Sequence, residues 1–140
     1  MELNDIYDKD RNRTGRLHRR GTPWKKGEYG LVVCVWVYDG EGKLLLTRRA
    51  PEKSFAGTWE NSGGAAKAGE SSLEAAQREL EEETGIHVEQ EELIFLGAEG
   101  KEGSYVDCYL VHKDVSLFDL VLQEGETTDA RNSLRGGTGL

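Results

Sequence analysis

Cysteine and long apolar runs are scarce in this sequence, and each scarcity excludes a class of protein. The two cysteines among 140 residues, Cys34 and Cys108, lie inside apolar runs and lack the spacing of a zinc site or a disulfide framework. No apolar run approaches the roughly 20 residues that a membrane-spanning helix needs. The first residues also lack the basic region of a signal peptide. We therefore expect a cytoplasmic protein that does not enter a membrane.

Positive charge is also in short supply. The chain has 18 Lys and Arg against 26 Asp and Glu, a formal net charge of -8, whereas broad nucleic-acid-binding surfaces need clustered Lys and Arg. This excludes such a surface but leaves room for one small phosphorylated ligand, held through a cation or a local basic patch. The chain is long enough for one domain and too short for two.

The order of apolar patterns predicts a single α/β domain over residues 1–131. Residues 1–28 are polar and rich in turn residues, which predicts an N-terminal hairpin extension. The run of β-branched and aromatic residues at 31–38 predicts a strand that is apolar on both faces. Further strands are expected at residues 43–48, 58–63, 87–88, 93–98 and 105–112. Residues 132–140 are rich in glycine and poor in apolar residues, so we expect a disordered tail.

A helical pattern begins after Ser71. Ser71 and Glu74 have the spacing of a capping box, and Gly85 is placed to end the helix in a left-handed conformation, so the helix should run to about Thr84. At about 100° per residue the apolar side chains fall on one stripe. The stripe consists of Leu73, Ala76, Leu80 and Thr84.

Three carboxylates fan out beside that stripe, from Glu79, Glu82 and Glu83. Like charges at this spacing destabilise a bare helix, and a hard divalent cation such as Mg²⁺ would compensate for them. Taken alone, the cluster is more typical of a solvated acidic face, as most charge runs on helices are. Two neighbouring features favour a binding site instead. Glu70 lies just before the helix, and the glycine-containing loop at 63–69 can turn backbone groups toward a ligand.

The same stretch resembles a known family motif. The matching stretch consists of Gly64, five further residues, Glu70, seven further residues and then Arg78-Glu79-Leu80-Glu81-Glu82-Glu83-Thr84-Gly85-Ile86. It is similar to the complete Nudix box, with every fixed position in agreement. The resemblance covers about residues 5–131. It implies a Nudix-like α/β/α sandwich around a mixed β-sheet. It also implies a Mg²⁺-dependent hydrolase, with Mn²⁺ as an alternative ion, that cleaves the diphosphate linkage of a nucleoside diphosphate derivative or related small molecule by water attack at phosphorus.

Family roles carry over by position. The resemblance implies that Glu79, Glu82 and Glu83 hold the metal, with the Gly64 carbonyl as a candidate further ligand. It implies that Arg78 orients a glutamate, and that Glu70 steadies the loop, binds metal through water or contributes to substrate binding.

Other roles are less specific. Glu82 is the candidate catalytic base, and Glu126 lies where some family members supply a glutamate from a separate loop. Arg48 and Arg49 end a strand near the expected cleft, where either can bind a substrate phosphate or simply be solvated.

Two rival functions stay open. The N-terminal extension and residues 30–49 look like the Nudix branch that contains isopentenyl diphosphate isomerase. That isomerase needs a cysteine and metal-binding histidines, but here Ser62 is followed by Gly63-Gly64-Ala65-Ala66, and Gly30 occupies roughly the place of one histidine. Hydrolase is therefore preferred. The second rival is a non-catalytic module that binds a nucleotide or diphosphate, and the intact set of acidic residues disfavours it.

The C-terminal part of the chain departs from the family pattern. Family members commonly continue past the equivalent of Asp129-Ala130-Arg131 into a tryptophan and a second helix, which is missing or incomplete here. One apolar face of the strand at 31–38 would then lack a cover. We therefore expect a homodimer or reduced stability.

Overall fold

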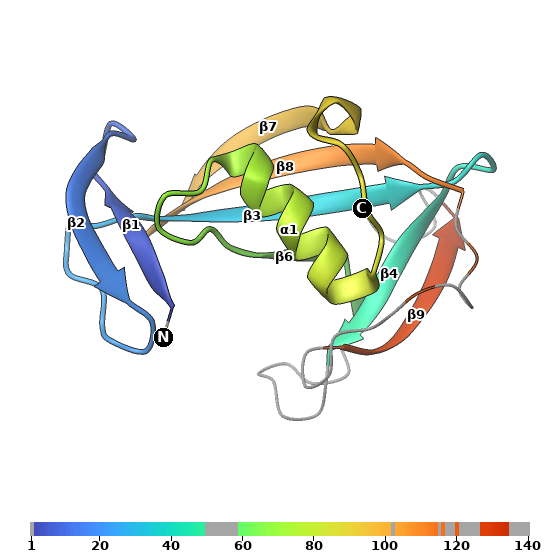
Figure 1. The fold of residues 1–140 in the computed structure, drawn as a ribbon, viewed down its shortest axis with the longest axis horizontal. Coiled ribbons are helices and arrows are strands. Elements are labelled where there is room, and N and C mark those ends of the chain that lie inside the picture. The colour runs from blue at the N-terminus through green and yellow to red at the C-terminus, as the bar shows by residue number, and fades with distance from the viewer. Residues whose placement is uncertain are drawn as a thin grey trace.

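The computed structural model describes residues 2–49, 59–101, 103–114, 116, 120 and 127–134. Its strands and helices follow in chain order (Figure 1). They are β1 (Leu3–Tyr7), β2 (Arg13–Arg19), β3 (Gly30–Tyr38), β4 (Lys43–Arg49), β5 (Trp59–Glu60), β6 (Ser62–Ala65), α1 (Ser72–Thr84), the short 3-10 helix η1 (Gln90–Glu92), β7 (Ile94–Lys101), β8 (Ser104–His112) and β9 (Thr127–Leu134).

Seven of the strands form one mixed sheet, which confirms the predicted α/β fold class. Its main path runs β5-β4-β3-β8-β7, with β6 also paired to β3 and β9 to β4. β3 and β8 are parallel along their whole length, from Gly30 opposite Ser104 to Tyr38 opposite His112, and the other pairs are antiparallel. The long central strand β3 therefore joins both halves of the sheet.

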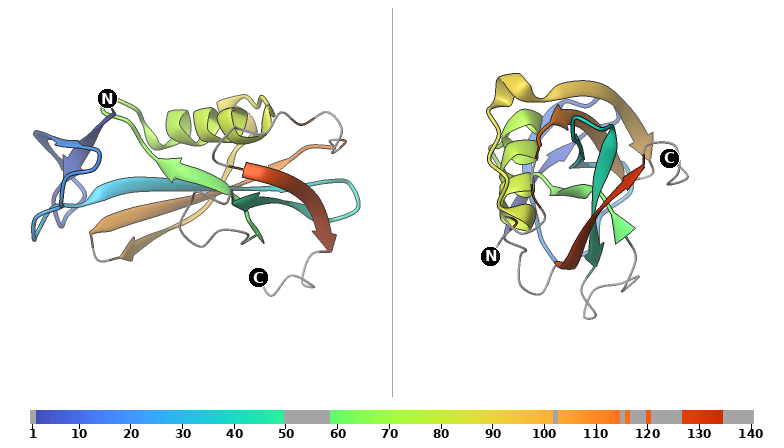
Figure 2. Two further views of the ribbon diagram at one scale, coloured as in Figure 1. Left: turned by 90° about the horizontal axis from the view of Figure 1, so that it is seen from below. Right: turned by 90° about the vertical axis from the view of Figure 1, so that its right-hand side faces the viewer.

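The core lies between the sheet and α1, which covers one sheet face (Figure 2). Alternate β3 side chains from Leu31 to Val37 are buried on this face, where Leu80 of the helix is fully buried. The intervening β3 residues, from Val32 to Tyr38, are half-buried on the other face. A second helical layer is not present among the described residues, and none of their helices has the length and apolar character needed to cross a membrane.

The predicted helix signals are all present in α1. The Ser71 hydroxyl accepts a hydrogen bond from the Glu74 backbone N–H at 3.1 Å, and the Glu74 carboxylate accepts one from the Ser71 N–H at 2.9 Å. Gly85 ends the helix with a φ of 80°. A cap of this kind stabilises a helix by about 1 kcal/mol. The two ends fix the rotation of the helix, and with it the direction of its carboxylates.

The expected N-terminal hairpin is formed by β1 and β2, and an ion pair between a partly exposed arginine and a buried aspartate connects its turn to the domain. Arg11 donates to both carboxylate oxygens of Asp107 in β8, at 2.7 and 2.5 Å. The buried Asp107 carboxylate also accepts a hydrogen bond from the hydroxyl of Ser72, the first residue of α1, at 2.6 Å. Burial alone would raise the pKa of Asp107, but the Arg11 and Ser72 hydrogen bonds outweigh it and lower the pKa. The hairpin and the start of α1 therefore share one anchor.

Two sequence predictions were wrong. The expected strand at 87–88 is a loop, in which Val88 packs under α1 and its carbonyl accepts a hydrogen bond from Gln77 instead of pairing in the sheet. The disordered tail was predicted to begin at residue 132, but residues 132–134 belong to β9, where Leu134 pairs with Lys43; residues 135–140 lie outside the described residues. Strand pairing uses backbone groups, so an edge of β4 can hold a polar segment that lacks an apolar pattern.

Candidate active site

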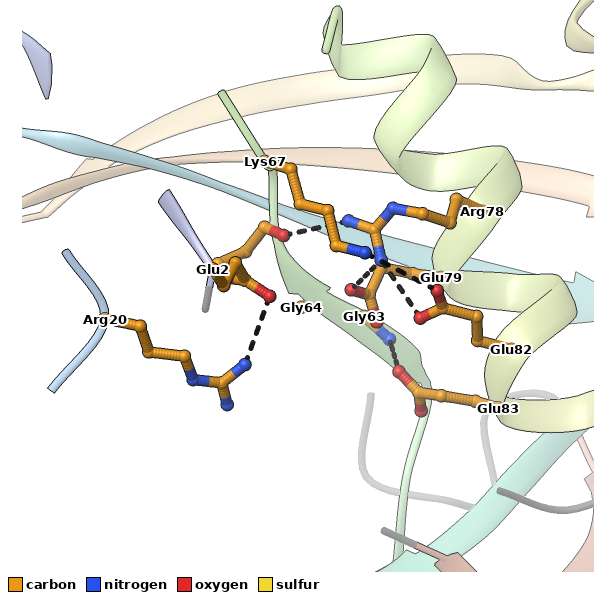
Figure 3. Close-up of a pocket in the computed structure, with 10 residues that line it drawn as sticks. Glu2, Arg20, Gly63, Gly64, Lys67, Arg78, Glu79, Glu82 and Glu83 are labelled. Carbon is orange, nitrogen blue, oxygen red and sulfur yellow. Dashed lines mark hydrogen bonds and ion pairs between the residues drawn. The ribbon is translucent and has the colours of Figure 1, made fainter. Parts of the chain in front are cut away.

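The predicted metal carboxylates come together on one pocket of about 320 Å³. Glu79, Glu82 and Glu83 project from α1 toward strand β6, which contains Gly63 and Gly64 (Figure 3). The remaining lining residues are Glu2, Arg20, Ala65, Lys67 and Arg78. The acidic residues of α1 are therefore not a uniform solvated face, because three of them share a concave surface with basic groups.

Arg78 lines the pocket and donates hydrogen bonds to three glutamates. Its Nε and Nη2 donate to the two oxygens of Glu70 at 2.6 and 2.9 Å, which is a bidentate contact. Its Nη1 donates to Glu79 at 2.8 Å and to Glu82 at 3.0 Å. The hydrogen bond to Glu70 and the neighbouring acidic charges raise the pKa of Arg78, so the guanidinium stays charged. Arg78 thus holds Glu70, Glu79 and Glu82 through hydrogen bonds from one guanidinium.

Glu70 holds the loop between β6 and α1. Besides Arg78, its carboxylate accepts a hydrogen bond from the Lys67 backbone N–H at 2.7 Å. Burial alone would raise the pKa of Glu70, but these hydrogen bonds outweigh it and lower the pKa. Both Glu70 oxygens are engaged within the protein, and the residue does not line the carboxylate pocket. This geometry fits a loop-steadying residue better than a substrate ligand.

Two of the carboxylates are deeply placed. Glu83 is only 6% exposed and accepts a hydrogen bond from the Gly63 backbone N–H at 3.1 Å. Burial raises the pKa of Glu83 well above its usual range despite that hydrogen bond, with a further contribution from the Glu79 charge. Burial likewise raises the pKa of Glu79, outweighing the hydrogen bond from Arg78. Two acids buried close together at such a cost are typical of a functional site.

The two glycines of β6 are required by space. A Cβ at Gly64 would lie 2.6 Å from the Glu79 carboxylate, and a Cβ at Gly63 would lie 2.4 Å from the Val33 carbonyl oxygen of β3. Only glycine at 64 lets the β6 backbone approach the Glu79 carboxylate so closely. Only glycine at 63 lets β6 pair with β3 at this distance.

The donor set fits a hard divalent cation. Glu79, Glu82 and Glu83 offer carboxylate oxygens, which are the ligands that Mg²⁺ prefers, on a pocket open to a phosphate and to water. In this conformation the described residues do not form a ready cluster of three acidic, histidine or cysteine ligands, because Glu79 and Glu82 both contact Arg78. A bound cation would therefore compete with Arg78 for these two carboxylates.

Sequence reasoning did not assign two basic residues to the pocket. Arg20, just after β2, and Lys67, in the loop before α1, line it together with the carboxylates. Arg20 belongs to the N-terminal extension. It is far from the motif along the chain, so no sequence signal assigned it to the site. The backbones of Arg48 and Arg49 end β4, and their side chains lie outside the described residues, as does Glu126.

Comparison with known proteins decides the family. The family model described as NUDIX domain matches residues 28–135, well over half of the chain. This chain belongs to the NUDIX family. An uncharacterized Nudix hydrolase of Listeria monocytogenes is 35% identical to this NUDIX protein over 133 residues, which cover 94% of this chain and 79% of the relative. The predicted family is therefore confirmed, and the protein is a Nudix-type pyrophosphohydrolase.

Further relatives place this NUDIX protein near the predicted branch. An isopentenyl-diphosphate Delta-isomerase of Serratia proteamaculans is 33% identical over 126 residues, covering 84% of this chain and 67% of the relative. A solved Deinococcus radiodurans protein is similar with a TM-score of 0.78 at 22% identity, covering 95% of this chain and 83% of that chain. The NUDIX domain of Shewanella oneidensis NrtR, solved in complex with ADP ribose, gives a TM-score of 0.65 at 18% identity, covering 86% and 80%. At such identities the two structures confirm the fold alone.

Proposed function

We propose that this NUDIX protein is a Mg²⁺-dependent enzyme that cleaves a diphosphate linkage by attack of water at phosphorus. The observation that carries the proposal is the meeting of Glu79, Glu82 and Glu83 on one pocket, where Gly64 packs against the Glu79 carboxylate. A solvated acidic face would not need this close fit, whereas a metal ligand that must be held in place does.

Glu79, Glu82 and Glu83 would hold the cation, with the Gly64 carbonyl as a further candidate ligand. When bound, Mg²⁺ or Mn²⁺ supplies positive charge that neutralises phosphate oxygens and activates water. Glu82 is the proposed base, and it would take the proton of the attacking water on a carboxylate oxygen. It is 38% exposed, so that water can reach it more easily than it can reach Glu79 or Glu83.

Lys67 and Arg20 are proposed to bind substrate phosphate oxygens. The Lys67 ammonium lies 4.0 Å from Glu82, and the Arg20 guanidinium contacts Glu2 at 3.3 Å on the opposite side of the pocket (Figure 3). Neither cation is engaged as tightly as Arg78. A diphosphate placed over three carboxylates needs such positive charge in addition to the metal.

The isomerase is the second candidate, because a relative carries that name. The geometry of β6 argues against it. A cysteine in the place of Gly63 would collide with the Val33 carbonyl oxygen, and one in the place of Gly64 would collide with Glu79. Neither glycine position of β6 therefore accepts a cysteine without displacing the β3 backbone or the Glu79 carboxylate.

The test is phosphate or nucleotide release from a panel of nucleoside diphosphate derivatives and alkyl diphosphates, with Mg²⁺ and with EDTA. Glu82→Gln and Glu83→Gln should each lower kcat by at least about 100-fold. Binding of the substrates without release would favour the non-catalytic module, and equal rates in both variants would refute the carboxylate mechanism. Conversion of isopentenyl diphosphate without hydrolysis would favour the isomerase.

Two further properties expected from the sequence remain proposals. A cytoplasmic location is favoured by the placement of both cysteines inside strands β3 and β8, where reduced thiols are ordinary. The homodimer is favoured by the half-buried second face of β3. Light scattering of the purified chain tests it, and a monomer with high thermal stability would refute the expectation.

A further inference from the structure

The two cysteines of the chain are far apart in the sequence but lie side by side in the sheet. Cys34 of β3 and Cys108 of β8 are direct partners in the parallel register of these neighbouring strands (Figure 1). Partners of this kind point to the same face of a sheet. The preceding residues, Val33 and Asp107, are buried on the α1 face. Both thiols therefore point to the opposite face, where both are half-buried, and we call these two residues the dithiol pair.

The dithiol pair is close enough to form a disulfide. Adjacent strands lie about 4.8 Å apart, and disulfides join Cα atoms that are about 4.4–6.8 Å apart. The Cβ atoms of a disulfide are closer, at about 3.8 Å, so those of Cys34 and Cys108 must approach each other by about 1 Å. Side chains on this face do reach across the two strands, because the rings of Tyr38 and His112, another registered pair, stack with centroids 4.9 Å apart. Both cysteines are reduced in the structure, so a disulfide needs an oxidant and one small movement.

Glycine lies on both sides of the dithiol pair. Gly63 of β6 is the partner of Cys34, and Gly97 of β7 is the partner of Cys108. A Cβ at Gly97 would meet no atom within 4 Å, so there is open space beside the Cys108 side chain. The pairing of β7 with β8 is irregular between Phe95 and Gly97, and a ladder disrupted in this way resists a shift of β8 less than a regular one. A small thiol-reactive molecule can therefore reach Cys108 from the side of β7.

The same row of residues leads to a proposed metal ligand. A Cβ at Gly63 would lie 3.2 Å from the Cα of Cys34, so the β6 backbone packs directly against this residue. The Gly63 N–H donates at 3.1 Å to the buried Glu83 carboxylate, which lines the carboxylate pocket. When Cys34 is drawn toward β8, it moves away from Gly63 and removes the support of the backbone that holds Glu83. The dithiol pair is therefore connected to the metal site through a single strand.

We propose that Cys34 and Cys108 are an oxidation site, at which a disulfide forms and weakens metal binding at the carboxylate pocket. The regulatory consequence rests on the proposed hydrolase function, whereas disulfide formation does not. The oxidant is a small disulfide such as oxidised glutathione. The Cys108 thiolate attacks one of its sulfurs, the sulfur–sulfur bond breaks, and one glutathione leaves as a thiolate. The Cys34 thiolate then attacks Cys108 Sγ and displaces the second glutathione, so the two thiol hydrogens of the protein end on two reduced glutathiones.

The first experiment measures disulfide formation alone. The full chain is incubated with oxidised glutathione, its thiols are counted after denaturation, and its intact mass is measured. Both thiols should be lost with a mass lower by two hydrogen atoms, and dithiothreitol should restore them. Cys34→Ser should instead keep one bound glutathione on Cys108, because the thiol that displaces it is missing. Unreacted thiols, a lasting glutathione adduct on the parent chain, or a disulfide-linked dimer would each overturn the oxidation site.

The second experiment measures the consequence at the metal site. Mn²⁺ affinity, followed by electron paramagnetic resonance, should be about tenfold weaker in the disulfide form, because a hydrogen bond to a charged group contributes about this factor. Phosphate or nucleotide release with Mg²⁺ should fall with it, and dithiothreitol should restore both. The double variant Cys34→Ser/Cys108→Ser is the matched control, and its Mn²⁺ affinity should not respond to oxidised glutathione.

The outcomes separate this proposal from the hydrolase proposal. An unchanged Mn²⁺ affinity in the disulfide form would overturn the regulation. Hydrolysis by a chain that forms no disulfide would overturn the oxidation site and leave the hydrolase proposal intact. A disulfide that weakens Mn²⁺ binding in a chain without hydrolytic activity would support the control of the metal site and refute the hydrolase.

Discussion

Gly63 and Gly64 are adjacent, yet adding one methyl group to each should damage different properties of the protein. The Cβ of Gly64→Ala would lie 2.6 Å from both the Cδ and Oε2 of Glu79, which is the far end of a flexible side chain. The Cβ of Gly63→Ala would lie 2.4 Å from the Val33 carbonyl oxygen, which belongs to the backbone of β3. In the first variant a side chain must move, and in the second a strand must move.

The distances set the expected size of each effect. Ordinary contact begins at 3.4 Å, so the Glu79 carboxylate must shift by about 0.8 Å in Gly64→Ala. A misplacement of this size in a catalytic constellation costs roughly 100-fold in rate. Loss of the 2.8 Å hydrogen bond from Arg78 destabilises the fold, while the smaller entropy of the unfolded alanine chain offsets part of that, so stability should change by no more than about 1 kcal/mol.

For Gly63→Ala the strand pair must separate by about 1 Å, and overpacking of this kind costs about 1–3 kcal/mol. Urea denaturation gives the two stabilities, and kcat/KM together with Mn²⁺ affinity by electron paramagnetic resonance gives the state of the site. Gly64→Ala should keep its stability and lose about 100-fold in kcat/KM. A Gly64→Ala variant with parental kcat/KM and Mn²⁺ affinity would refute the reasoning, as would one that is destabilised as much as Gly63→Ala.

Two other perturbations follow from the ion pairs. Arg11→Ala should destabilise the fold by about 2 kcal/mol at pH 7, a value reduced because Arg11 is 36% exposed. Because the pKa of Asp107 is lowered in the folded state, its stabilising contribution is complete above the unfolded pKa near 4 and is lost as pH falls through the folded pKa. The difference in unfolding free energy between the parent and Arg11→Ala, measured by urea denaturation, should therefore be smaller at pH 3 than at pH 7. An equal difference at both pH values would contradict this. Arg78→Lys keeps the charge but not the bidentate contact with Glu70, and should lower kcat about 10- to 100-fold with an unchanged circular dichroism spectrum. A rate within twofold of the parent would show that orientation by Arg78 is dispensable.

Sequence alone predicted the parts of the site that local signals encode. The capping box at Ser71, the left-handed Gly85 and the spacing of the glutamates all lie within one helix, and the structure has each of them where the pattern placed it. The apolar run at 31–38 likewise predicted the strand that the structure has as β3, whereas the mixed sheet was implied by the family resemblance. These features depend on residues within a few turns of one another.

The parts that were missed depend on contacts between distant segments. Arg20 reaches the pocket because the N-terminal hairpin docks on the domain through pairs such as Arg11 with Asp107, which are 96 residues apart. The strand β9 pairs with β4 through its backbone, so its polar side chains carried no signal. The apolar residue at 88 was assigned to a strand, although it is buried by packing under α1. Apolar character predicts burial, but not the element that provides it.

The three pocket carboxylates differ in how far the fold restrains them, and this difference separates their proposed roles. Glu83 is buried and tied to the Gly63 N–H, and Glu79 is confined between Arg78 and the Gly64 backbone. Glu82 has one contact of 3.0 Å to Arg78 and a second, at 4.0 Å, to Lys67. Ligands that fix an ion should be rigid, whereas a base must reach the attacking water, accept its proton and later release that proton to solvent. The restraints therefore favour Glu79 and Glu83 as the fixed ligands and Glu82 as the base.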